Sequence, residues 1–117
     1  KYMNHKDLEA WKYSMKFVTN IYQITRKFPQ AELYGLTSQI RRAAMSIPAN
    51  IAEGCARQSD KETIQFLYIS IGSIAELETE LLIAQNLGYI FEVENLLDDL
   101  VKIRSLILGL AKYLKTK

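Results

Sequence analysis

The chain has 117 residues, of which 49% are hydrophobic and 24% are charged, with only five Gly and two Pro. This composition is typical of a single globular domain over residues 1–117 and excludes a disordered or low-complexity chain. The single cysteine excludes an internal disulfide, and no apolar run approaches the ~20 residues that span a bilayer, so we expect a cytoplasmic protein without a membrane partner.

The first helix is predicted over about residues 6–27, where apolar residues recur at steps of three and four, the period of one helical face. The expected core positions of this helix are Leu8, Trp11, Met15, Val18 and Tyr22. The helix should end before Phe28 and Pro29, because the residue that precedes a proline is disfavoured in the helical conformation.

The second helix is predicted over about residues 35–57 and carries two distinct faces, with Gly54 weakening its last turn. Its apolar arc consists of Leu36, Ile40, Ala43, Ile47 and Ile51. Its polar arc, about 80° wide at ~100° per residue, consists of Gln39, Arg42, Ser46, Asn50 and Glu53. Gln39, Ser46, Asn50 and Glu53 are interpreted as a structural polar network across helices or between subunits, provided that every buried group is paired.

Pro48 lies inside this second helix, where it removes one hydrogen bond and crowds the carbonyl of Ala44. A kinked helix is the favoured interpretation, because the apolar arc passes through the proline without a change of register. The alternative is two helices, with Ser46 capping the second one and Pro48 in its first turn.

Two further helices are predicted over about residues 60–87 and 91–115. Ser59 and Glu62 have the spacing of a capping box at the start of the third helix, and Gly88 is able to end that helix in the left-handed conformation. The apolar face of the third helix is Leu67, Ile71, Ile74, Leu77 and Leu81. That of the fourth is Val93, Leu96, Leu97, Leu100, Ile103, Ile107, Leu110 and Leu114.

Four helices joined by short connections predict an all-α, antiparallel up-down-up-down four-helix bundle. The first helix has a second apolar file, Tyr13, Phe17, Ile21 and Ile24, on an arc away from its expected core face. One bundle core cannot absorb both files, so we interpret the second file as a homo-oligomer interface. The alternative is that Tyr13 and Ile24 are scattered surface residues.

Several stretches of the chain resemble one known family. They are DLEAW at 7–11, FP at 28–29, YGLTSQIRRAA at 34–44, SIPANIAEG at 46–54, GS at 72–73, ELE at 76–78 and LGYI at 87–90. The family comprises small four-helix-bundle proteins, among them the 23S rRNA intervening-sequence protein and the accessory protein of diversity-generating retroelements. The resemblance implies a bundle that assembles into a ring-shaped homopentamer. It also implies that retroelement members bind RNA and a reverse transcriptase through a basic surface.

Nucleic-acid contacts are the first functional hypothesis. The net charge of +2 is unevenly divided, with nine Lys or Arg against four Asp or Glu in residues 1–57 and six against nine in residues 58–117. The candidate contacts are Arg41, Arg42 and Arg57, together with a stripe on the first helix formed by Lys12, Lys16 and Lys27. Such cations could follow a phosphate backbone. The alternative is that they are ordinary solvated lysines and arginines.

An enzyme is not expected. His5 is the one histidine, so the paired Glu-x-x-His motifs of di-iron bundles cannot be built, and Cys55 lacks a nearby ligand or catalytic partner. Glu76 and Glu80 are interpreted as a solvated face or as partners for lysines. We therefore predict no catalytic residue, metal or cofactor. The predicted function is a non-catalytic oligomeric scaffold that binds RNA, and the alternative is a protein–protein assembly module without nucleic-acid contact.

Overall fold

A computed structural model describes residues 3–117, which form four α-helices and two short 3-10 helices with no strand among them. Helix α1 spans Glu9–Thr25, α2 spans Leu36–Cys55, α3 spans Asp60–Asn86 and α4 spans Glu94–Thr116. The 3-10 helices η1 (His5–Asp7) and η2 (Gln30–Glu32) lie before α1 and between α1 and α2. The all-α class and the four helices are confirmed, and each helix begins and ends within three residues of its predicted bounds.

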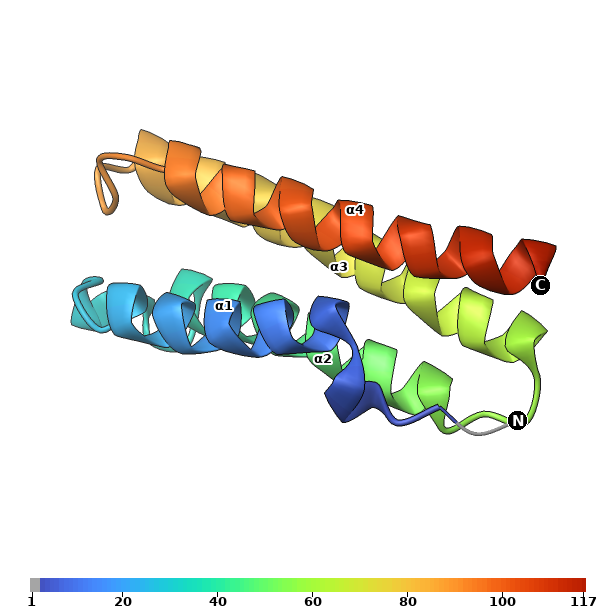
Figure 1. The fold of residues 1–117 in the computed structure, drawn as a ribbon. Coiled ribbons are helices and arrows are strands. Elements are labelled where there is room, and N and C mark those ends of the chain that lie inside the picture. Colours follow the sequence, from blue (N-terminus) through green and yellow to red (C-terminus); the bar gives the residue numbers. More distant parts are fainter. Residues whose placement is uncertain (1–2) are drawn as a thin grey trace.

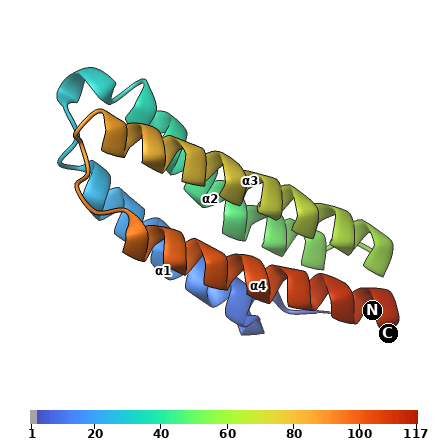
Figure 2. The ribbon, with the colours of Figure 1, turned by 90° about the horizontal axis from the view of Figure 1, so that it is seen from above.

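The four helices lie side by side along the long axis of the molecule (Figure 1). Helices α1 and α3 end, and α2 and α4 begin, at one end of the bundle, whereas α1 begins and α4 ends toward the other end (Figures 1 and 2). Each helix packs against its neighbours in the chain, and α1 also packs against α4; within residues 3–117 the diagonal pairs α1 with α3 and α2 with α4 have no Cα atoms within 8 Å of each other. The α1–α4 side and the α2–α3 side are therefore opposite faces.

The core is built from the predicted apolar faces of α2, α3 and α4. Ile40, Ile51, Leu67, Leu81 and Ile107 have no exposed surface at all. Branched and unbranched aliphatic side chains at steps of three and four interdigitate across the helices, which is the packing that stabilises such bundles.

The predicted inward face of α1 is only partly correct, since Leu8, Trp11 and Val18 are half-buried and pack against the core without filling it. The residues that α1 buries are Ala10, Ser14, Phe17, Ile21 and Thr25, whereas Met15 is 43% exposed and Trp11 is half-buried. Two of these buried residues are polar, and their hydroxyl groups donate to carbonyls of their own helix, Ser14 to Ala10 at 2.6 Å and Thr25 to Ile21 at 2.8 Å. A hydroxyl that is satisfied within its own turn can be buried, so this face does not look apolar in the sequence.

The correction also changes the predicted oligomer interface. Phe17 and Ile21 are 4% and 0% exposed because they fill the core of their own chain, so they are not available to a second copy as an exposed file. Tyr13 remains at the surface and Ile24 is half-buried. What is left of the predicted interface is the edge of α1 next to α4.

Helix α2 continues through Pro48 without interruption, so the alternative of two helices is wrong. The proline is buried in the bundle. At the same turn, the hydroxyl of Ser70 in α3 donates to the carbonyl oxygen of Ile47 at 2.9 Å. This contact ties α3 to the part of α2 in which the proline removes a backbone donor.

The ends of α3 follow the predicted signals. The Ser59 hydroxyl oxygen accepts the backbone N–H of Glu62 at 3.2 Å and donates to the Glu62 carboxylate at 3.2 Å. Gly88 has a φ of 81°, and beyond it the Tyr89 N–H bonds to the Ala84 carbonyl at 2.9 Å. The N-terminal cap and the left-handed glycine are confirmed, although the carboxylate binds the Ser59 side chain rather than its backbone.

Replacing Ser59 with alanine tests the cap. We expect the free energy of unfolding to fall by ~1 kcal/mol, because one N–H of the first turn of α3 loses its acceptor. Urea denaturation measures the change. Ser105→Ala, at an exposed position inside α4, is the control and should stay within about 0.5 kcal/mol of the parent; equal losses in both variants would contradict the assignment of the cap.

Candidate nucleic-acid interface

Three lysines predicted to form a stripe lie exposed along the outer side of α1 and its C-terminal turn. They are Lys12, Lys16 and Lys27. The one ion pair among them joins Lys12 to Glu9 at 3.5 Å, and both side chains are more than half exposed. An exposed pair of this kind contributes little, so it leaves Lys12 able to bind a phosphate.

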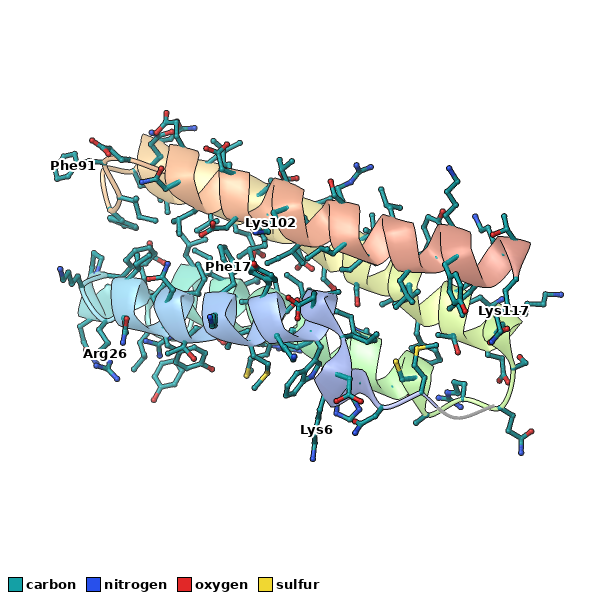
Figure 3. The ribbon with its side chains drawn as sticks, in the orientation of Figure 1. Lys6, Phe17, Arg26, Phe91, Lys102 and Lys117 are labelled. Carbon is teal, nitrogen blue, oxygen red and sulfur yellow. The ribbon has the colours of Figure 1, made fainter. Side chains whose placement is uncertain are left out.

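Next to this stripe, α1 and α4 border a hollow of about 300 Å³. We call it the α1–α4 hollow, and its lining residues are Tyr13, Lys16, Phe17, Asn20, Asp99, Lys102 and Ile103. Phe17 and Ile103 are apolar and the other five side chains carry polar groups. Figure 3 shows Phe17 and Lys102 between α1 and α4, whereas Lys6 and Arg26 point away from the bundle.

Lys102 is a functional candidate that sequence reasoning missed. Its Nζ donates to the Tyr13 hydroxyl at 3.0 Å and lies 4.1 Å from the centre of the Tyr13 ring. The hydrogen bond to Tyr13 raises the pKa of Lys102, so its charge is retained. No local pattern connects two residues this far apart in sequence, and only the packing of α1 against α4 brings them together.

Arg41 has a structural position rather than a free one. Its Nε donates to the Thr25 hydroxyl at 2.9 Å, and its guanidinium lies 4.5 Å from the centre of the Tyr22 ring. A second guanidinium nitrogen reaches the Tyr22 carbonyl at 3.5 Å. Arg41 therefore holds the last turn of α1 against α2.

The three predicted arginines do not form one cluster. Arg57 pairs with Glu53 at 2.7 Å and stacks at 4.6 Å on the Phe66 ring, beyond the C-terminal end of α2. Arg42 is exposed near the other end of α2 and borders the α2–α3 side. A surface formed jointly by Arg41, Arg42 and Arg57 is therefore not present in the chain.

Part of the predicted polar network does form between α2 and α3. The hydroxyl groups of Ser46 and Ser73 lie 2.7 Å apart, and the Asn50 amide donates to the Ser46 hydroxyl at 2.9 Å and to the Ser46 carbonyl at 2.8 Å. Within residues 3–117, Gln39 and Arg42 form no hydrogen bond or ion pair with these three residues. Glu53 instead pairs with Arg57, so the predicted network is split into separate parts.

A second hollow of about 410 Å³ lies between α2 and α3, and we call it the α2–α3 hollow. Its lining residues are Tyr34, Ser38, Gln39, Arg42, Ala43, Ser46 and Glu76. All of them except Ala43 carry a polar group. Polar side chains therefore border the surface on both sides of the α2–α3 seam.

Glu80 lies one turn after Glu76 and is only 8% exposed, so the expectation of a solvated face is wrong for this residue. Its Oε1 has no hydrogen-bond partner in the part of the chain that the structure describes. Burial, followed by the nearby charge of Glu76, raises the pKa of Glu80 to about 7. The sequence does hold a signal, since Glu80 is seven residues after the buried Ser73 and next to the core residue Leu81.

An apolar groove of about 320 Å³ follows the outer side of α1 and α2. Its lining residues are Trp11, Met15, Val18, Met45, Pro48, Ala49 and Ala52. Exposed apolar surface of this kind is typical of sites at which proteins meet.

Residues 3–117 hold no group of three His, Cys, Asp or Glu side chains able to bind a metal ion. Cys55 is buried, with its thiol 3.7 Å from the Met3 sulfur. Among the described helices, none combines the length and the apolar character that crossing a membrane requires.

The fold and these surfaces define a small all-helical bundle protein with an exposed lysine stripe on one side and polar and apolar grooves on the others. The family model for the 23S rRNA-intervening sequence protein matches residues 6–109, and the chain belongs to this family. No curated protein matches the chain significantly.

Proposed function

We propose that this protein is a non-catalytic, homo-oligomeric scaffold that binds RNA through the lysine stripe of α1 and acts in the cytoplasm. The observation that carries the proposal is the exposure of Lys12 and Lys16 on α1 and of Lys27 in the turn that follows it. The family description, which refers to 23S rRNA, supports RNA as the polyanion. A homopentameric ring is the assembly that the family resemblance implies.

Repetition in a ring makes a weak contact useful. Three lysines per chain neutralise few phosphates, and single contacts of this kind give low affinity. In a ring of several copies, one RNA molecule meets the same stripe repeatedly, so the second and later contacts form at a high effective concentration.

The RNA proposal predicts a specific salt dependence. We expect wild-type protein to bind a structured RNA at ~50 mM salt and to lose most of that affinity by ~200 mM. Lys12→Gln/Lys27→Gln should weaken binding at least several-fold and reduce the slope of log affinity against log salt by about 1.5 to 2 for each copy that contacts the RNA, because two phosphate contacts per copy are lost. Fluorescence anisotropy of a labelled RNA measures both quantities.

The matched control is Lys61→Gln/Lys112→Gln, which removes two exposed lysines from α3 and α4. It should bind like wild type. Absence of binding by wild type at low salt, or equal losses in the two double variants, would refute the proposed surface. Arg41 is unsuitable for this test because its substitution removes contacts to Thr25 and Tyr22 and so changes the fold.

A second candidate function is a protein–protein assembly module without RNA contact. The observation that favours it is the apolar groove around Trp11, Met15 and Pro48. Apolar docking responds weakly to salt, so the anisotropy experiment also separates the two functions when it is repeated with a protein partner.

A further inference from the structure

We infer that the α2–α3 hollow of one copy docks against the α1–α4 hollow of the next copy, with Glu76 placed opposite Lys102 of the neighbouring copy. The inference rests on the proposed homo-oligomer and adds to it the two surfaces that meet. It also assigns Lys102 and, from the lysine stripe, Lys16 to assembly, and leaves Lys12 and Lys27 to contact RNA.

The positions of the two hollows are the first argument. They lie on opposite faces, because α1 packs against α4, α2 packs against α3, and neither diagonal pair packs together. Both also lie in the same half of the bundle. Arg42 and Lys102 are in the first halves of α2 and α4, which begin at one end of the bundle, and Glu76 is in the second half of α3, which ends there.

Contact between two different faces is heterologous, and it generates a ring if the rotation closes or an open filament if it does not. Closure into a ring therefore requires the two docked faces to be inclined to each other, whereas parallel faces would stack in a line.

Charge complementarity is the second argument. The α2–α3 hollow has the carboxylate of Glu76 on its wall, with Glu80 one turn further, and Arg42 on its other side. The α1–α4 hollow has Lys16 of α1 and Lys102 of α4 on its rim. Asp99, one turn before Lys102 on α4, also lines it. Docking the two hollows therefore brings carboxylates to ammonium groups, and it also gives Arg42 a carboxylate partner in Asp99.

The third argument is that Arg42, Glu76 and Glu80 form no ion pair within the described chain, whereas Lys102 binds the Tyr13 hydroxyl. Residues 3–117 contain three ion pairs, Lys12–Glu9, Arg57–Glu53 and Lys117–Asp60, and none of them involves Arg42, Glu76 or Glu80. Glu80 is nine-tenths buried and has an oxygen without a donor. Glu80 shares a hydrogen bond with Glu76, and two neighbouring carboxylates repel each other when both are ionised, so a cation from a second copy stabilises the seam.

An exposed aromatic side chain borders the first hollow, and apolar side chains line part of the second. Tyr34, beside the α2–α3 hollow, is 94% exposed. The α1–α4 hollow has Phe17 and Ile103 among its lining residues, with Tyr13 beside them. An exposed aromatic ring that enters an apolar pocket with a charged rim has the arrangement of an interface anchor.

A charge exchange tests the inference. Glu76→Lys places two ammonium groups opposite each other, and Lys102→Glu places two carboxylates opposite each other, so each variant should raise the dissociation constant of the assembly on the order of 100-fold. The double variant Glu76→Lys/Lys102→Glu restores opposite charges and should recover most of the wild-type assembly. Sedimentation velocity over a concentration series measures the masses, and circular dichroism checks the helix content of each variant.

Two charge-matched controls are Glu92→Lys and Lys112→Glu, which change exposed residues outside both hollows and should assemble like wild type. A monomeric wild type would refute the proposed oligomer itself. An assembled wild type whose mass is unchanged by Glu76→Lys and Lys102→Glu would overturn only the docking inference. Failure of the folded double variant to assemble would also overturn the pairing of Glu76 with Lys102.

Discussion

Gly54→Ala is expected to lower the free energy of unfolding by ~1–3 kcal/mol, although alanine is the better helix former. A Cβ atom at Gly54 would lie 2.8 Å from the Cβ of Phe66 and 3.2 Å from the Thr63 carbonyl oxygen, so α2 and α3 would have to separate. Separation also weakens the hydrogen bond from the Thr63 hydroxyl to the Gly54 carbonyl, which is 2.7 Å long. The steric cost therefore outweighs the ~1 kcal/mol gain in helix propensity.

Gly72→Ala is the matched control, because Gly72 is also inside a helix but a Cβ there meets nothing within 4 Å. This variant should gain ~0.5–1 kcal/mol. Thermal and urea unfolding of both variants give the comparison, with a loss of ~2 kcal/mol lowering Tm by roughly 10 °C. If Gly54→Ala and Gly72→Ala change the free energy of unfolding in the same direction, the close contact at Gly54 does not decide the effect of its substitution.

Glu80 should make the stability of the chain depend on pH between about 4.5 and 7. Its pKa is raised from 4.5 to about 7 in the folded chain, mainly by burial. Over this interval the folded chain binds more protons than the unfolded chain, so stability is highest at the acidic end and falls as the pH rises. The contribution of this one group is ~2–3 kcal/mol, and it is lost as the pH rises through 7, so that it is gone by about pH 8.

Glu80→Gln removes this dependence, because an amide cannot ionise. At pH 8 the variant should be more stable than wild type by ~2–3 kcal/mol, whereas near pH 4.5 the two should be equally stable. Urea unfolding from pH 4.5 to 8, at a dilution where the chain is monomeric, measures the effect of Glu80 without a neighbouring copy. Glu92→Gln, at an exposed position, is the control. If the free energies of unfolding of wild type and Glu80→Gln change with pH in parallel, the burial of an ionisable Glu80 is contradicted.

The lysine stripe and the helices illustrate what local patterns are able to predict. The steps of three and four residues in α2, α3 and α4 predicted the faces that fill the core, because amphipathic helices bury their apolar side in almost any bundle. Ser59 and Gly88 marked the ends of α3, since capping depends on atoms only a few residues apart. Exposure of Lys12 and Lys16 followed equally from their spacing on one helix, and Lys27 is exposed in the turn after it.

The face of α1, the arginines and Glu80 were predicted wrongly or incompletely for a different reason. Which of the two apolar files on α1 faces inward depends on how closely α1 approaches its neighbours, and the small residues Ala10 and Ser14 permit that approach. Arg41 is bound at the end of α1, and Glu80 is buried at the α2–α3 seam, through contacts with a neighbouring helix.

The sequence by itself therefore determined the helices, their ends, the apolar faces of α2 to α4 and membership of the family. Only the tertiary structure decided the inward face of α1, the close contact at Gly54, the pairing of Lys102 with Tyr13 and the burial of Glu80. The physical reason is the range of the interactions. Helix periodicity and capping act within a few residues, whereas burial, steric fit and pKa depend on side chains that meet only when the helices pack.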